Sequence, residues 1–180
     1  MKAEEGIELV DRDQLRRYFE QGCKSSSEWG IGSEYENFIF DIDLKRPISY
    51  EGPKSISKIF ELLINKFDWV PVFEKSTIVG LEKDKANISL EPGGQFELSG
   101  AIKKTIHEVD QEMKSFMQNM KVVCEELGLR LFSIGACPNW ERTDMPIMPK
   151  NRYKKIMMPY MQTVGTQGLD MMLRTCTIQV

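Results

Sequence analysis

The sequence contains no long hydrophobic run, only one histidine and no closely spaced pair of cysteines. No segment approaches the ~20 consecutive apolar residues that a membrane helix needs, so no membrane association is expected. His107 alone excludes a site that needs several imidazoles, such as the HExxH site of a metalloprotease. The cysteines show no CxxC spacing and therefore indicate neither a zinc site nor a disulfide framework; they are Cys23, Cys124, Cys137 and Cys176.

A surplus of basic residues is also missing. The chain has 24 Lys and Arg against 27 Asp and Glu, a net charge of -3, so no nucleic-acid partner is expected. Its start, MKAEEGIELVDRD, is acidic where a signal or transit peptide would be basic or apolar, and this predicts a cytoplasmic protein. The 180 residues, 41% of them hydrophobic, suffice for one ordinary domain or for part of a larger one.

Hydrophobic periodicity predicts four helices. The first is capped by Asp11 or Asp13 and ends at Gly22, and the second runs from about residue 55 to 66. The clearest helix runs from about residue 101 to 127, before Gly128, and a short one starts at Tyr153. The apolar positions of the long helix recur at steps of three and four; they are Ile102, Ile106, Val109, Met113, Phe116, Met120, Val123 and Leu127.

The remaining segments predict strands. WGIGSEYENFIFD comes first, followed by WVPVFE, TIVGLEK and ISLEPGGQFELS, whose short turns favour antiparallel hairpins. LRLFSIG and a last strand from about residue 171 to 180 complete the pattern. The sum is an α+β fold with a mostly antiparallel sheet covered by helices on one side, and residues 1–180 are expected to belong to a single domain.

Acidic residues lie on the predicted strands in a suggestive pattern. The strand period of two places Glu34 and Glu36 on one face, and Glu97 shares a face with Gln95 and Ser99. If the two strands belong to one sheet, the three carboxylates converge, which suits Mg²⁺ and substrate phosphates. The alternative is an ordinary solvated face, since charged strand residues are usually exposed. The Pro-Gly-Gly turn after Glu91 favours the site, because a kink can re-aim a neighbouring side chain.

The end of the chain offers further polar candidates. In the predicted last strand Thr177 and Gln179 lie on a polar face, whereas Arg174 lies on the opposite, apolar face. An arginine there needs an anion or a carboxylate partner, or else it reaches out to water. His107 lies beside the apolar stripe of its helix and is interpreted as an exposed structural residue.

Four segments together resemble a known family. IGSEYENFIF, LEPGGQFELSG, MPIMPKNRY and VGTQGLDMMLRTCTIQV are similar to the plant and proteobacterial type of glutamate–cysteine ligase, and the resemblance covers nearly the whole chain. It implies a glutamine-synthetase-like catalytic sheet, the first step of glutathione synthesis, and the substrates glutamate, cysteine and ATP. It further implies that ATP phosphorylates the side-chain carboxylate of glutamate before the amine of cysteine attacks.

The resemblance also assigns roles to residues. It implies Mg²⁺ or Mn²⁺ ligands at Glu34, Glu36 and Glu97, with Glu91 as a possible further metal or phosphate site. Substrate carboxylate or phosphate oxygens are expected to bind Arg152, Arg174, Thr177 and Gln179. No side-chain nucleophile is required.

The sequence departs from the family pattern at three points. Tyr35 stands where the family often has histidine, but it faces away from the acids. RYKKIM is one residue longer than the usual form, which would shift the following helix relative to Arg152. The family's enzymes are more than twice as long, so we expect the chain to correspond to their N-terminal portion and to be inactive alone. The alternative is a truncated or non-catalytic homologue that binds a ligand or a partner.

Overall fold

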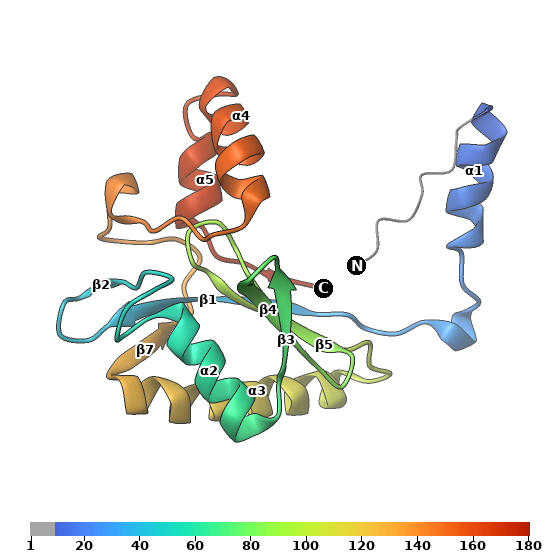
Figure 1. Ribbon diagram of the computed structural model, residues 1–180. Coiled ribbons are helices and arrows are strands. Elements are labelled where there is room, and N and C mark those ends of the chain that lie inside the picture. Colours follow the sequence, from blue (N-terminus) through green and yellow to red (C-terminus); the bar gives the residue numbers. More distant parts are fainter. Residues whose placement is uncertain (1–9) are drawn as a thin grey trace. The chain divides into compact units, whose positions relative to one another are not determined.

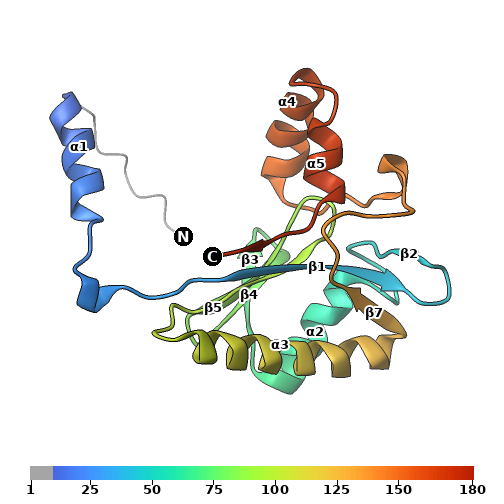
Figure 2. The same ribbon diagram turned by 180° about the vertical axis from the view of Figure 1, so that it is seen from behind.

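The computed structural model describes residues 10–180, which divide into two compact units between Gly30 and Ile31. The first unit contains helix α1 (Arg12–Gln21) and the short helix η1 (Ser26–Glu28), drawn in blue in Figures 1 and 2. The side chain of Asp11 accepts a hydrogen bond from the Gln14 backbone, and Gly22 follows the last turn. The predicted first helix is therefore confirmed.

The second unit is built on one eight-stranded sheet whose paired strands are all antiparallel. Strand β1 is its centre, because it pairs with β2, β6, β7 and β8. The predicted α+β class with an antiparallel sheet is confirmed. The strands are β1 (Glu34–Asp41), β2 (Arg46–Pro47), β3 (Val70–Glu74), β4 (Thr77–Lys83), β5 (Ala86–Leu90), β6 (Phe96–Ser99), β7 (Leu129–Phe132) and β8 (Ile178–Gln179).

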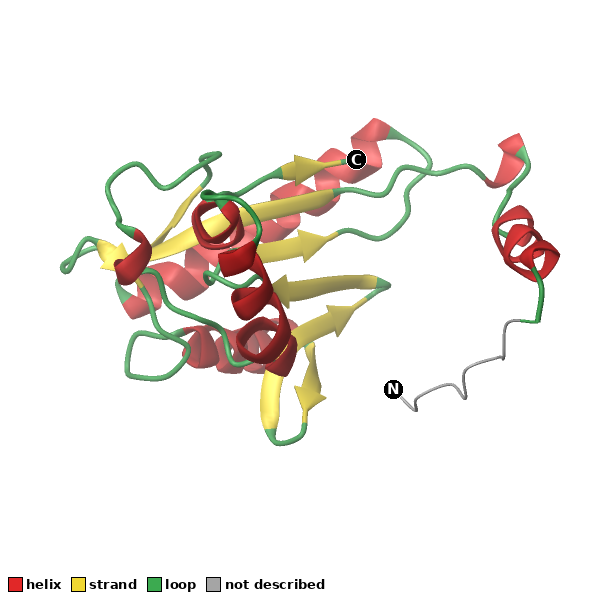
Figure 3. Ribbon diagram, turned by 90° about the horizontal axis from the view of Figure 1, so that it is seen from above, coloured by secondary structure: helices red, strands yellow, loops and turns green. Residues whose placement is uncertain are grey.

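Helices lie on both faces of this sheet. Helices α2 (Ile56–Phe67) and α3 (Ile106–Leu127) cover one face, below the sheet in Figure 1, and we call it the α2/α3 face. Helices α4 (Met158–Thr163) and α5 (Gly168–Arg174) lie on the other face, as Figure 3 shows from above. The prediction that helices cover one side only was wrong, because the short C-terminal helices pack on the opposite side.

Each face has its own hydrophobic cluster. The larger cluster joins Ile59 and Phe60 of α2 and Met120 of α3 to sheet residues such as Leu98, all 1% exposed or less. The smaller one places Phe38 of β1 against Met172 and Leu173 of α5, together with the loop residues Cys137 and Met145. The second cluster therefore fixes α5 on the sheet.

Helix α3 begins later than its apolar pattern predicts. Thr105 is its N-cap and forms a capping box with Glu108, so the segment from residue 101 to 105 lies outside the helix. Ile102 is 68% exposed and Ile106 62%, so neither contributes to the core. The Thr-x-x-Glu capping box favours a helix that starts after Thr105, and it prevails here over the hydrophobic period, which predicts a start at about residue 101.

The predicted last strand is the clearest error in secondary structure. Met171 to Arg174 belong to α5, and only Ile178 and Gln179 form a strand. Leu169, Met172, Leu173 and Cys176 recur at helical spacing and pack in the smaller cluster. Burial of that stripe explains why a helix forms up to Arg174.

Two further observations concern the described residues. Among residues 10–180, no helix is both long enough and apolar enough to span a bilayer. The four cysteines are free thiols, of which Cys23 is exposed and the others are buried.

Candidate functional site

A row of polar side chains crosses three strands on the face opposite α2 and α3. Glu36 of β1 lies directly opposite Glu97 of β6, and Glu97 lies opposite Ser89 of β5. Directly paired residues of antiparallel strands point to the same face, with Cβ atoms about 5 Å apart. We call this set, Ser89, Glu97 and Glu36, the first polar row, and the face that carries it the acid face.

A second polar row lies beside the first. Glu34 is paired with Ser99 of β6 on one side and with Gln179 of β8 on the other, and Ser99 is paired with Asn87 of β5. Glu34, Glu36 and Glu97 thus share one face of the sheet, as the strand period predicted. The polar side of the last strand faces them as well, because Gln179 opposes Glu34.

Hydrogen bonds with Thr177, the residue before β8, orient Glu36. The Thr177 backbone N–H donates to Glu36 Oε2 at 2.7 Å, and the Glu36 N–H donates to the Thr177 carbonyl at 3.1 Å. Gln179 Nε2 donates to Thr177 Oγ1 at 3.0 Å. Partial burial raises the pKa of Glu36, and the nearby charges of Glu97 and Glu91 raise it further, against the Thr177 hydrogen bonds.

Hydroxyl groups hold the buried carboxylate of Glu97. Ser99 Oγ donates to Glu97 Oε1 at 2.5 Å, and Ser89 Oγ lies 3.4 Å from both Glu97 Oε1 and Glu91 Oε1. Burial raises the pKa of Glu91, and the charge of Glu97 adds to this, whereas Lys150 and Arg152 oppose it. The two serines therefore position an acidic pair that like-charge repulsion would otherwise separate.

The carboxylates do not form a closed metal cage. Within residues 10–180, no group of three Asp, Glu, His or Cys side chains is close enough to hold one ion. Nor does any lysine or arginine of that range form a salt bridge with Glu34, Glu36, Glu91 or Glu97. Mg²⁺ is commonly bound by one or two carboxylates together with waters and substrate phosphates, and so does not need a closed cage.

Two cations lie at the edge of the acid face. The Lys150 ammonium is 5.4 Å and the Arg152 guanidinium 5.0 Å from the ring centre of Tyr153. Tyr153 is completely buried, and its hydroxyl donates to the Leu90 carbonyl at 2.6 Å, which ties it to the end of β5. Arg152 therefore lies near Glu91, and its predicted role in binding substrate stays a prediction; Lys150 was not predicted.

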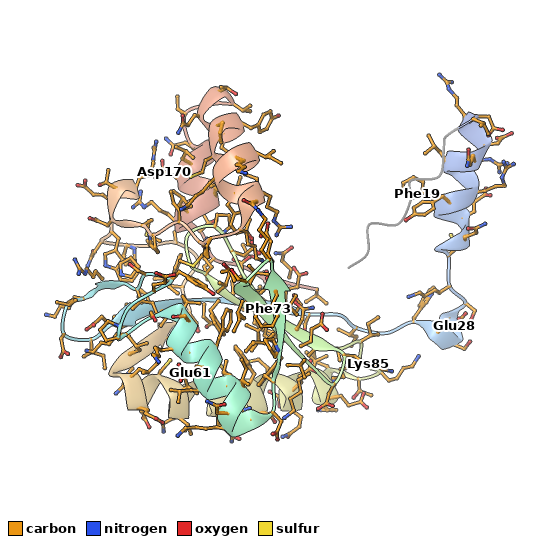
Figure 4. The ribbon with its side chains drawn as sticks, viewed as in Figure 1. Phe19, Glu28, Glu61, Phe73, Lys85 and Asp170 are labelled. Carbon is orange, nitrogen blue, oxygen red and sulfur yellow. The ribbon has the colours of Figure 1, made fainter. Side chains whose placement is uncertain are left out.

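Arg174 occupies a different environment from the one its predicted strand implied. It lies at the end of α5, where its guanidinium binds Asp170 of the same helix (Figure 4) at 2.9 Å and approaches the Cys137 carbonyl at 3.4 Å. Asp170 also binds Arg142. These contacts fasten α5 to the loop before it. The partner of Arg174 is therefore a carboxylate of its own helix, that of Asp170.

The Pro-Gly-Gly turn serves mainly to seat α5. Gly93 lies so close to the backbone of Leu173 that a Cβ atom there would collide with the Leu173 oxygen. Gln95, which is buried, donates to the Thr175 carbonyl at 2.7 Å and the Met172 carbonyl at 3.3 Å, and so satisfies the end of the helix. The turn brings Glu91 toward the acids as part of the same arrangement.

Comparisons with known proteins decide the family. The model of glutamate-cysteine ligase family 2 (GCS2) matches residues 30–180. The chain belongs to this family. It is 47% identical over 173 residues to the chloroplastic glutamate–cysteine ligase of Medicago truncatula, covering 96% of this chain and 33% of that protein. It is 45% identical over 180 residues to chloroplastic ligase B of Oryza sativa subsp. japonica, covering 98% and 36%.

This member of the ligase family spans about a third of the length of the curated relatives that it matches. The prediction of a cytoplasmic location was wrong: these relatives, and the ligase of Arabidopsis thaliana at 46% identity, are chloroplastic. The acidic composition of residues 1–13 describes only that stretch and could not decide the location.

Two residues of the site, Lys150 and Ser99, were given no role from the sequence alone. Lys150 precedes Arg152 and Tyr153 in KNRY, and two cations beside a buried aromatic residue are a recognisable pattern. Ser99, which orients Glu97, follows it by two residues and so lies on the same strand face. Both could be found only once the strand register had joined the four segments.

Proposed function

We propose that this chain supplies the metal- and phosphate-binding sheet of an ATP-dependent glutamate–cysteine ligase of the glutamine-synthetase-like type. The product would be γ-glutamylcysteine, the first intermediate of glutathione synthesis. The observation that carries the proposal is the first polar row, in which Glu36 and Glu97 face each other across β1 and β6 without a cationic partner among residues 10–180. The names of the relatives support the choice of substrates.

The proposed reaction has two steps. The side-chain carboxylate of glutamate attacks the γ-phosphorus of ATP, so that a C–O–P bond forms and the bond to ADP breaks. The amine of cysteine then attacks the activated carbonyl, a C–N bond forms, phosphate leaves and the amine loses a proton. Positioning and charge stabilisation supply the catalysis in such transfers, and no side-chain nucleophile is needed.

The chain's own residues would hold and orient the reacting groups. Glu36 and Glu97, with Glu34 beside them, would bind Mg²⁺ or Mn²⁺, which neutralises phosphate oxygens when bound. Thr177 keeps a Glu36 oxygen in place through its backbone N–H, and Ser99 holds a Glu97 oxygen through its hydroxyl. Gln179 adjoins Glu34 and can donate to a substrate oxygen from the second polar row.

Metal binding by the 180-residue chain tests the first part of the proposal. Mn²⁺ is titrated into the chain and bound ion is followed by electron paramagnetic resonance. We expect Glu36→Gln and Glu97→Gln to weaken binding at least tenfold, because each removes one charged ligand at constant volume. Glu82→Gln on β4 is the matched control and leaves binding unchanged, since Glu82 lies two strands away from Glu97.

Catalysis is tested in a chimera in which this chain replaces the matching third of the Medicago truncatula ligase. With ATP, glutamate and cysteine, the chimera should form γ-glutamylcysteine and release ADP faster than with alanine, glycine or ammonia. Glu36→Gln and Glu97→Gln should abolish most turnover. A folded chimera that binds Mn²⁺ and ATP without turnover would instead support the alternative, a non-catalytic ligand- or partner-binding homologue.

A further inference from the structure

The smaller hydrophobic cluster, where α5 packs on the sheet, contains thiols that the proposed reaction does not use. Among residues 10–180, four of the six buried members of this cluster carry sulfur, so an ion that enters it meets sulfur donors. Cys137 and Cys176 are free thiols, 4% and 6% exposed, and Met145 is 6% exposed. Two thiols and a thioether are therefore buried in one cluster.

The backbone brings these sulfur atoms together. The Cys137 N–H donates to the Arg174 carbonyl at 2.9 Å and the Cys176 N–H to the Gly135 carbonyl at 3.0 Å, in an antiparallel bridge. The two cysteines are therefore diagonal neighbours on one face. Cys137 Sγ lies 3.9 Å from Met145 Sδ. Because metal–sulfur bonds such as Zn–S are about 2.3 Å long, sulfurs up to ~4.6 Å apart can share one ion.

A positive charge adjoins the thiols. Burial raises the pKa of the Cys137 thiol to about 11, although the charge of Arg174 opposes this. Burial also raises the pKa of Cys176 to about 12, and the charge of Glu36 adds to it. Arg174 Nε is buried and has no hydrogen-bond partner among the described residues, while Nη2 approaches the Cys137 carbonyl at 3.4 Å. A thiolate formed at Cys137 would thus have a guanidinium beside it.

The donor atoms select the kind of ion. Thiolate and thioether sulfur suit Cu⁺, whereas a structural Zn²⁺ site takes four ligands from Cys, His, Asp and Glu. No three residues of those types could hold one ion in residues 10–180, so an ion in this cluster needs the Met145 thioether. Cys176 also lines a cavity of about 570 Å³ together with Glu36 and Thr177, which gives an ion a path to the sulfurs.

We propose that Cys137, Cys176 and Met145 form a three-sulfur site for a Cu⁺ ion beneath the acid face. Each thiol releases its proton to solvent as a copper–thiolate bond forms, the thioether adds a neutral donor, and the oxidation state of copper does not change. Two thiolates and one Cu⁺ leave a single negative charge, which the Arg174 guanidinium offsets. The site lies outside the carboxylate rows and goes beyond the proposed ligase function.

Copper binding by the 180-residue chain tests this site. Cu⁺ is titrated without oxygen, in competition with the coloured Cu⁺ chelator bicinchoninate, so the result does not depend on ligation. We expect Cys137→Ser and Cys176→Ser each to weaken binding more than about tenfold, because even outer-shell partners of a metal contribute ~10–100-fold. Cys124→Ser is the matched control, since Cys124 is a buried free thiol of α3 in the larger cluster, and it should leave the affinity unchanged.

Proton release separates the roles of the three sulfurs. A pH indicator should record two protons for each ion bound by the unmodified chain and by Met145→Leu, whose affinity falls, but one for Cys137→Ser. Met145→Leu nearly conserves volume, so it keeps the test open if a serine variant fails to melt cooperatively.

Four outcomes would overturn the copper site. They are an unmodified chain that takes no Cu⁺ from the chelator, a Cys137→Ser chain that binds it as Cys124→Ser does, tighter binding of Zn²⁺ than of Cu⁺, and loss of binding in Cys23→Ser. The last would show that copper had bound only the exposed thiol.

Discussion

The two faces of the central strand β1 are covered differently. On the α2/α3 face, Ile39 is buried and the Asn37 side chain accepts a hydrogen bond from Ser133 at 2.5 Å. On the acid face, Glu34 and Glu36 precede Phe38, which α5 covers. The α2/α3 face is thus packed around Ile39, whereas the acid face is packed at Phe38 and leaves opposed carboxylates at its other end. Stability and the site are therefore separated within one strand.

The largest expected difference compares two neighbours on β6. Leu98 is 1% exposed on the α2/α3 face, so Leu98→Ala should lower the free energy of unfolding by ~2–5 kcal/mol. Glu97→Gln should leave it unchanged or raise it, because it removes repulsion with Glu36 and Glu91. Urea unfolding of both variants measures the contrast. If Glu97→Gln lowers the free energy of unfolding as much as Leu98→Ala does, the acid face contributes to stability as much as the core does, and the comparison fails.

A smaller effect is expected where α5 rests on the acid face. Gly93→Ala introduces a methyl group against the Leu173 backbone, which cannot rotate away, so we expect a loss of ~1–3 kcal/mol. The control is Gly32→Ala, whose added Cβ has nothing within 4 Å. Thermal unfolding gives the stabilities, and near-ultraviolet circular dichroism reports the packing of the smaller cluster. Equal stability of the two variants would contradict the close seating of α5.

The smallest effect is expected in the turn after Arg152. Tyr153–Met157 form a π-helical turn, which contains one residue more than an α-helical turn would. If RYKKIM has the extra residue that the family resemblance predicts, this turn is where the helix would accommodate it. Deleting Lys155, which is exposed, should convert the turn to α-helix, change stability by ~1 kcal/mol or less, and leave Mn²⁺ affinity intact.

The control deletion lies in a regular helix. Removing the exposed Ser115 from α3 rotates everything after it by about 100°, which turns Met120 and Val123 out of the core and should prevent folding. Urea unfolding compares the two deletions. Comparable damage from both would show that the π turn is not a one-residue insertion.

The acid face was predictable because its determinants are local. A period of two fixes which side chains of β1 and β6 share a face, and only the register had to be supplied by the structure. The same holds for α1 and α2, whose caps Asp11 and Ser55 are explicit in the sequence.

The errors arose at positions whose structure depends on contacts with residues far away in the sequence. Whether Met171 to Arg174 form strand or helix depends on the pocket that Phe38 and Cys137 offer to Met172. The sequence suggested that the Pro-Gly-Gly turn aims Glu91, but it could not reveal the close contact of Gly93 with Leu173, far along the chain. Lys150 was missed because its position depends on the hydrogen bond from the Tyr153 hydroxyl to Leu90 at the end of β5, which the sequence does not show. The roles proposed for Glu34, Glu36, Glu91, Glu97, Arg152, Arg174, Thr177 and Gln179 stay predictions.

The pairing of β1 with β8 has a consequence for how the protein folds. Glu34 pairs with Gln179, so two segments from nearly opposite ends of the second unit must meet before the second polar row exists. The entropy of closing so long a loop makes this contact late, and sheets rich in such contacts fold in milliseconds to seconds rather than microseconds. Helices α2 and α3 can pack on the hairpins of β3 to β6 much earlier. Until β8 pairs with β1, Glu34 and Glu36 would lie at an unpaired edge of the sheet. The repulsion between their charges and those of another copy would help to keep that edge from pairing with another chain.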